Sequence, residues 1–257
     1  MSNALNVNDL CKTYVVNKRQ NHVLRNVNLT IEEGEFVAVM GPSGSGKTTL
    51  LYMVSGMDKI TSGRVDFFGQ DIATLLGNES SRVRLCEMGF IFQQMYMLKN
   101  LSIGDNILLP AYQSQENKGA AKRREKDEYA RILMRKMGID EIAENDITEV
   151  SGGQLQRACI CRSLINKPRM IFADEPTGSL NKQSSGEVMS ELVRVNSEGT
   201  TIMIVTHDVR VASQSDRVLY IIDGQIHGDR FLGKYEGEHT LRDRERALNN
   251  WLLDLGW

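Results

Sequence analysis

Short apolar runs, bounded by polar and glycine-rich turns, occupy both ends of the chain. Apolar positions alternate with polar ones over 4–10 and 26–31, which is typical of strands with one buried face. Further apolar runs predict strands at 35–40, 63–69, 88–93, 169–176 and 200–208. Helical spacing lies between these runs, after Leu50 and over 184–196. Strands that alternate with helices indicate an α/β fold with a parallel sheet and helical crossovers.

The pattern becomes helical in the middle of the chain. Four apolar side chains recur there at helical spacing, with charged residues on the opposite face. They are Tyr129, Ile132, Leu133 and Met137. We therefore expect a helical lobe inserted at about 95–165 into a single domain that covers 1–228.

The last stretch, 229–257, has an amphipathic pattern of its own. Its apolar positions share one stripe of a helix and comprise Leu241, Leu248, Trp251, Leu252 and Leu255. We expect a C-terminal helical extension that docks on the core of its own chain, and contact with a partner protein is the alternative. The charges over 242–246 are too balanced in sign for binding to lipid.

Composition and charge narrow the classes of function. The chain has 257 residues, 41% hydrophobic and 25% charged, which is enough to bury a substantial core. A net charge of −2 gives no electrostatic reason to expect a nucleic-acid partner. The longest apolar runs are far shorter than the ~20 residues that span a bilayer, and the N-terminus lacks the pattern of a signal peptide. We expect a cytoplasmic chain whose four scattered cysteines are free thiols.

The stretch GPSGSGKTT follows the strand at 35–40 and opens a helix. In this strand–loop–helix context, glycines let the backbone wrap the β- and γ-phosphates of a nucleotide and aim N–H groups at them. Lys47 supplies a positive charge, and the Thr48 hydroxyl is the expected ligand of Mg²⁺. The sequence therefore predicts an ATP site formed by Gly41, Pro42, Ser43, Gly44, Ser45, Gly46, Lys47, Thr48 and Thr49.

Polar side chains suited to hydrolysis end three of the predicted strands. Asp174 ends one strand, at the edge that faces the ligand in open α/β sheets, and we expect it in the Mg²⁺ shell. Glu175 follows it and is the candidate for polarising the attacking water. His207 ends another strand, where a neutral imidazole can bond the γ-phosphate and the water. Gln93 ends a third strand, where its amide can contact both Mg²⁺ and water.

Tyr14 precedes the phosphate loop, and its ring is suited to stacking on adenine. The alternative is that Tyr14 belongs to the core.

A second glycine pair stands about a hundred residues downstream of the first loop, in VSGGQLQR. Its small residues and helix N-terminus suit an anion, yet no lysine stands at the glycines. Together these motifs resemble the ATP-binding cassette (ABC) family over almost the entire chain, and VSGGQLQR is similar to the family's signature sequence. The resemblance implies a P-loop NTPase fold of the ABC type, with a mixed or parallel sheet, an antiparallel β part and an inserted helical lobe.

The resemblance also implies an ATPase that acts as a pair of chains. Two chains pair head to tail, and the γ-phosphate on one chain's phosphate loop meets the signature of the other. The residues expected to serve the partner's ATP are Ser151, Gly152, Gly153 and Gln154. Gln93 and the segment after it then relay closure to a membrane permease. Met95, Tyr96, Met97 and Leu98 form an adaptable docking surface for that permease, or else cover the lobe's own core.

Within the family, GQDIATL and FADEPTGSLN look most like the ATPases of the LolD, MacB and BceA type. That likeness implies a subunit of a bacterial transporter that exports a peptide, antibiotic or lipoprotein or gives resistance to such a compound. The subunit would lie on the inner face of the cell membrane, attached through its permease. A regulatory ATPase that signals through a permease in cell-wall or cell-division control uses the same motifs and remains the alternative. A cassette protein acting on DNA or ribosomes is disfavoured, because the chain has one cassette and a short lobe.

The chain departs from the family pattern at two positions. Asn181 stands where the family usually has aspartate, in a loop that crosses between the paired chains, so the loss of charge puts communication between the two sites in doubt. Val150 replaces the usual leucine before the signature, which is a small change at a packing position.

Overall fold

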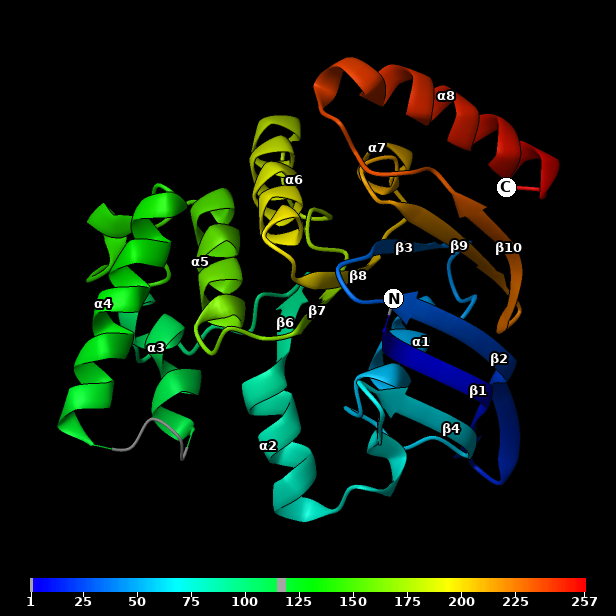
Figure 1. Cartoon of the computed structure of the whole chain (residues 1–257), viewed down its shortest axis with the longest axis horizontal. Helices are drawn as coiled ribbons and strands as arrows, with labels where there is room; N and C mark the ends of the chain where they lie inside the picture. The colour runs from blue at the N-terminus through cyan, green and yellow to red at the C-terminus, as the bar shows by residue number, and fades with distance from the viewer. Residues whose placement is uncertain (1, 115–118) are drawn as a thin grey trace. The chain divides into compact units, whose positions relative to one another are not determined.

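The computed structural model describes residues 2–114 and 119–257. Met1 and residues 115–118, which belong to the expected helical lobe, lie outside the described part. The chain divides into two compact units, one formed by Met1–Ser80 with Val193–Trp257 and the other by Ser81–Leu192. Figure 1 follows the chain from its first strands to its C-terminal helix.

The first unit begins with an antiparallel sheet. Its strand order is β2-β1-β4-β5, with β1 at Asn3–Val16, β2 at Arg19–Glu32, β4 at Ser62–Phe67 and β5 at Gln70–Asp71. A short 3₁₀ helix, η1 at Ile72–Thr74, follows β5. Asn17 and Lys18 join β1 to β2 with φ values of 50° and 63°, as a two-residue hairpin turn with the right twist requires. Apolar side chains alternate along both long strands, so one face of the sheet is buried.

The same unit contains four strands of a mixed sheet, in the order β10-β9-β3-β8. They are β3 at Phe36–Met40, β8 at Thr201–Val205, β9 at Arg217–Ile222 and β10 at Gln225–Phe231. β3 pairs in parallel with β8 and with β9, whereas β10 is antiparallel to β9. Every residue of β3 and β8 is buried, which explains why both read as continuous apolar runs. The helices α1 (Lys47–Val54) and α7 (Val209–Ala212) follow β3 and β8.

The second unit combines a parallel strand pair with a group of helices. β6 (Met88–Phe92) pairs in parallel with β7 (Met170–Asp174). α2 (Gly77–Glu87) leads into β6, and α6 (Lys182–Ser197) follows β7 and ends in the first unit. Between the strands lie α3 (Ile103–Gln113), α4 (Ala120–Lys136), the 3₁₀ helix η3 (Asp140–Ile142) and α5 (Gly152–Leu164). α3, α4 and α5 pack against one another, as Figure 1 shows. Among the described residues, no helix is both long and apolar enough to cross a bilayer.

The buried face of α4 differs from the expected one at Ile132. Leu133 and Met137 are buried as predicted, and Ala130 and Met134 join them. Ile132 is 41% exposed, because the spacing 130, 133, 134 and 137 centres the buried stripe on the neighbouring side of the helix.

The C-terminal helix α8 (Glu238–Asp254) packs against other elements of the first unit, among them α7. Leu241, Leu248 and Leu252 are buried. Arg244 fixes the docking, because its guanidinium donates to several backbone carbonyl groups before and after the β9–β10 hairpin. The acceptors are the carbonyl oxygens of Ser213 at 2.7 Å, Ser215 at 2.6 Å, Leu232 at 2.9 Å and Gly233 at 3.1 Å. Burial lowers the pKa of Arg244 from its usual value, but an arginine side chain stays charged in proteins.

We predict that Arg244→Met lowers the free energy of unfolding by about 2–3 kcal/mol. The substitution removes the hydrogen bonds that the charged guanidinium donates, and it leaves the carbonyl oxygens that accepted them without a donor. Urea unfolding followed by circular dichroism measures the change. Arg242→Met, an exposed residue of the same helix, is the control and should shift stability by less than about 0.5 kcal/mol. Equal stability of the two variants would show that Arg244 does not anchor α8.

Candidate nucleotide-binding site

The phosphate loop connects β3 to α1 and covers 41–46. Glycine is required at Gly41, because a Cβ atom there would lie 2.1 Å from the carbonyl oxygen of Ile221. Gly46 has a φ of 102° and immediately precedes α1, so the chain turns sharply into the helix. The loop therefore ends with the N-terminal amides of α1 at its rim, where the helix dipole favours an anion.

Two side chains of the loop fit a phosphate ligand. Lys47 Nζ donates to the carbonyl oxygens of Gly41 at 2.7 Å and Pro42 at 2.9 Å, so its charge lies over the loop. Ser45 is 4% exposed, and among the described residues its Oγ has no hydrogen-bond partner. A buried hydroxyl without a partner is destabilising unless a ligand or water bonds it. The loop thus has both a cation and an unsatisfied polar group of the kind that a phosphate oxygen satisfies.

His207 follows β8, beside the phosphate loop. The register pairs Val39 of β3 with Val205 of β8, and the Thr206 amide donates to the Val39 carbonyl at 3.1 Å. His207 is exposed, while Asp208 accepts from the amides of α7 and caps that helix. The parallel register thus brings His207 to the same sheet edge as the loop.

Tyr14 lies in β1, held by two residues that the sequence analysis did not single out. Its hydroxyl donates to Asp58 Oδ2 at 3.0 Å, and Lys12 Nζ lies 4.5 Å from its ring centroid and 2.8 Å from Asp58 Oδ2. Burial, and then the bond to Asp58, raises the pKa of Tyr14. The ring is fixed at its polar end and half-buried, a geometry suited to stacking.

In the second unit, β6 and β7 bring three predicted residues together. The register pairs Phe92 with Asp174, so Gln93 and Glu175 follow neighbouring strand ends. Gln93 leans over the loop after Glu175, since a Cβ atom on Gly178 would lie 2.9 Å from Gln93 Nε2. Glu175 has a φ of 46°, an uncommon conformation for a non-glycine residue and one that recurs at functional sites.

The predicted metal ligands are consistent with Mg²⁺ in chemistry. Thr48, Asp174 and Gln93 offer hydroxyl, carboxylate and amide oxygens, and Mg²⁺ prefers oxygen ligands completed by phosphate and water. Within 2–114 and 119–257, no cluster of three His, Cys, Asp or Glu side chains forms a metal centre.

The signature residues form the N-terminus of α5. Ser151 is the N-cap, and its Oγ accepts from the Gln154 amide at 3.3 Å. Gln154 Oε1 accepts in turn from the Ser151 amide at 2.9 Å and from its hydroxyl at 3.0 Å. This capping box satisfies two amides and leaves the glycine amides at the helix start, where the dipole attracts an anion.

Asn181, the departure from the family pattern, caps α6. Its Oδ1 accepts from the Ser184 amide at 2.9 Å, as a carboxylate oxygen would. Asparagine therefore preserves the local geometry of this turn, and only the charge is lost.

We predict that Ser45→Ala leaves thermal stability unchanged or slightly higher, because the hydroxyl makes no bond to the described residues. It should weaken ATP binding about tenfold, the value of roughly one good hydrogen bond to a charged acceptor. Calorimetric titration with ATP and differential scanning calorimetry measure the two effects. A lower melting temperature with unchanged affinity would place the hydroxyl in the fold and not in the site.

Comparison with known proteins agrees with this arrangement. The ABC transporter family model matches residues 24–178. The macrolide export ATP-binding/permease protein MacB of Bdellovibrio bacteriovorus is 37% identical over 94% of this chain, which spans 36% of that relative. The bacitracin export ATP-binding protein BceA of Halalkalibacterium halodurans is 39% identical, and the ABC transporter ATP-binding protein YknY of Bacillus subtilis is 37% identical. The alignment with BceA covers 87% of each chain, and that with YknY covers 86% of this chain and 94% of YknY.

Solved structures agree as well. The dimeric structure of MJ0796, a bacterial ABC transporter cassette, matches with a TM-score of 0.81 and 35% identity over 89% of this chain and 98% of that one. Its post-hydrolysis state bound to ADP and Pi matches with a TM-score of 0.80 and 34% identity. The chain belongs to the ABC transporter family and has the fold of its ATP-binding cassette.

Proposed function

We propose that this chain is the ATP-hydrolysing subunit of a membrane transporter, and that it works as a head-to-tail dimer with a permease. The observation that carries the proposal is the presence of two helix starts suited to phosphate in one chain, α1 after Gly46 and α5 after Ser151. Only the loop before α1 is followed by a lysine. The start of α5 is therefore suited to a phosphate that the phosphate loop of another chain already holds. Relatives that are described as a dimeric cassette and as export ATP-binding proteins support this reading.

Each residue has a separate role in the proposed reaction. The phosphate loop and Lys47 hold the β- and γ-phosphates, and Tyr14 stacks on adenine. Glu175 accepts a proton from the attacking water, while His207 hydrogen-bonds the γ-phosphate and keeps that water in line. Thr48, Asp174 and Gln93 would hold Mg²⁺, which supplies charge neutralisation on the phosphates. Ser151 and the glycine amides of the partner's signature complete the site and exclude water.

The proposed membrane contact lies in the segment after Gln93. Tyr96 is 57% exposed and Leu98 is 46% exposed, so two large apolar side chains lie close together on the surface. Arg162 of α5 fixes the backbone beneath them, donating to the carbonyls of Met95 at 2.5 Å and Tyr96 at 2.8 Å. An ordered backbone with exposed apolar side chains is suited to docking a permease helix. The chain would then lie on the inner face of the membrane, attached through that permease.

We predict that Glu175→Gln lowers the turnover number at least a hundredfold and leaves ATP binding intact, because it removes the proton acceptor but not the phosphate loop. With hydrolysis blocked, ATP should convert the monomer to a dimer on size-exclusion chromatography with light scattering. Glu144→Gln, an exposed substitution of the same type, is the control. Turnover of Glu175→Gln at the parent rate, or no dimer at saturating ATP, would contradict the proposal.

We predict that Leu98→Glu abolishes co-purification with an integral membrane protein and keeps the basal ATPase rate of the isolated chain. The reason is that a charge buried at an apolar interface without a partner is strongly unfavourable. Leu253→Glu is the matched control, since Leu253 is 65% exposed and lies on α8. Tagged chains isolated from native membranes and analysed by mass spectrometry give the readout. Equal recovery of a permease by both variants would exclude this docking surface.

A further inference from the structure

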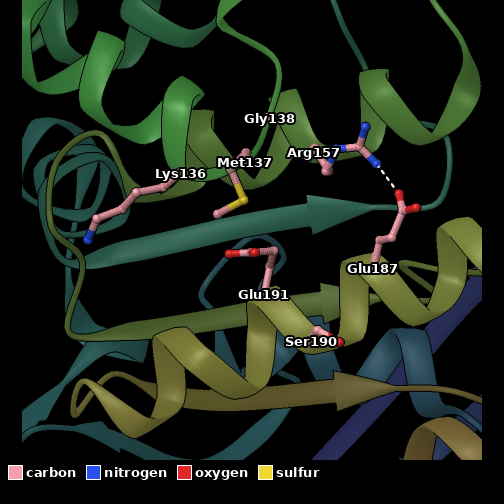
Figure 2. Close-up of a pocket in the computed structure, with 7 residues that line it drawn as sticks. All are labelled: Lys136, Met137, Gly138, Arg157, Glu187, Ser190 and Glu191. Atoms are coloured by element: carbon pink, nitrogen blue, oxygen red, sulfur yellow. Dashed lines mark hydrogen bonds and ion pairs between the residues drawn. The ribbon is translucent and has the colours of Figure 1, made fainter.

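α5 and α6 are joined at their N-terminal ends by contacts that the proposed reaction does not use. Both helix starts belong to the second unit, and Figure 2 shows the side chains of Arg157 and Glu187 reaching toward each other between them. Arg157 Nη1 lies 2.5 Å from Glu187 Oε2. Gln183 Nε2 donates to the other oxygen of the same carboxylate at 3.3 Å.

One turn closer to the signature, the start of α5 packs closely against side chains of the segment that opens α6. A Cβ atom on Gly153 would lie 2.7 Å from Ser184 Oγ, and one on Gly152 would lie 3.7 Å from Leu180. The start of α5 is therefore seated directly on the start of α6. Glycine at 153 is required by this close approach as well as by any access of phosphate to the amides.

Further along the helices the contact opens into a cavity of about 450 Å³. Its lining comprises Lys136, Met137, Gly138, Arg157, Glu187, Ser190 and Glu191. In Figure 2, Arg157 and Glu187 lie at one end of this lining and Lys136 at the other. The Arg157–Glu187 ion pair joins α5 to α6 at this end of the cavity lining. The Arg157 side chain is 16% exposed and the Glu187 side chain is 43% exposed, so salt screens the attraction between them only in part.

The start of α6 is in turn tied to Glu175. Asn181 caps α6, the Leu180 amide donates to the Thr177 carbonyl at 3.0 Å, and the Gly178 amide donates to the Glu175 carbonyl at 3.0 Å. These consecutive hydrogen-bonded turns restrict movement of the segment between Glu175 and α6. A shift of α6 therefore moves the Glu175 backbone.

We propose that Arg157 and Glu187 are positioning residues that couple the two ATP sites of the dimer. The γ-phosphate of the partner's ATP, bound at the N-terminus of α5, fixes the orientation of α5. The ion pair and the Gly153–Ser184 contact then fix the orientation of α6 relative to α5. α6 in turn positions Glu175 next to the chain's own ATP. This coupling rests on the proposed head-to-tail dimer. It assigns to Arg157 a role in cooperativity and none in holding a nucleotide.

The test compares Arg157→Ala, Glu187→Ala and the conservative Arg157→Lys in the full chain. The alanine variants should lower the Hill coefficient of ATP hydrolysis toward 1. In the Glu175→Gln background, they should raise the ATP concentration for half-maximal dimerisation at least fivefold, the low end of ordinary coupling between sites. ATP affinity of the monomer, measured at protein concentrations below dimerisation, should stay unchanged. Arg157→Lys keeps the charge and should recover much of the Hill coefficient.

A second ion pair of α6 provides the control, because Arg194 Nη1 lies 2.6 Å from Glu198 Oε1 four residues later on the same helix. Arg194→Ala should leave both readouts at parent values. If Arg157→Ala folds and keeps the parent Hill coefficient and dimerisation curve, the coupling role is overturned. If Arg157→Ala loses monomer ATP affinity or unfolds and Arg157→Lys behaves like alanine, the residue is structural and the coupling role is also overturned. Failure of the Glu175→Gln chain, with Arg157 and Glu187 intact, to dimerise at saturating ATP would instead reject the dimer proposal itself.

Discussion

Parallel pairing of buried strands is the constraint on which the rest of this structure depends. β3, β8, β6 and the first four residues of β7 consist almost entirely of apolar side chains, so polar chemistry has no place along them. It is confined to the ends, and parallel register gathers those ends at one edge. That is why the phosphate loop and His207 follow neighbouring strands in the first unit, and why Gln93 and Glu175 do so in the second. A one-residue slip in either pair would move the functional residues apart as well as exposing core side chains.

The sequence predicted these strands because their signal is local. Continuous apolar runs that end in glycine, acidic residues or histidine are visible without knowledge of the partner strand. β10 was not predicted, because its residues are exposed or half-buried in alternation, with no apolar run. α2 was not predicted either: it has Val83 as its only buried residue, so no helical period exists to detect. Both elements depend on neighbours distant in sequence, which local patterns do not encode.

In the candidate site too, local sequence patterns predicted some residues, and contacts between residues far apart in the sequence supply others. Residue types at strand ends and in glycine loops were identified from the sequence, because phosphate and Mg²⁺ require them in a fixed order. The residues that hold Tyr14 were not, because Lys12 and Asp58 are separated by 46 positions and join only through the fold of the sheet. Arg157 is the last residue of the motif VSGGQLQR, but no sequence pattern indicated that Glu187, on the next helix, is its partner. Supporting contacts are long-range, and any of several charged residues satisfies them.

α5 carries two of these supporting roles at once. Its N-terminus presents the signature glycines, and near its other end Arg162 holds the carbonyls of Met95 and Tyr96. The Cys159 thiol adds a contact to the Met95 carbonyl at 3.5 Å, and burial raises its pKa to about 11, so it stays a protonated donor. A 13-residue helix spans about 20 Å, and its continuous backbone hydrogen bonds hold its two ends in a fixed relation. In the proposed transporter, one rigid helix therefore links the partner's phosphate to the surface that meets the permease, and Arg157 gives the same helix a connection to Glu175. Under that proposal, a change in the orientation of α5 would reach both the hydrolysis site and the docking surface.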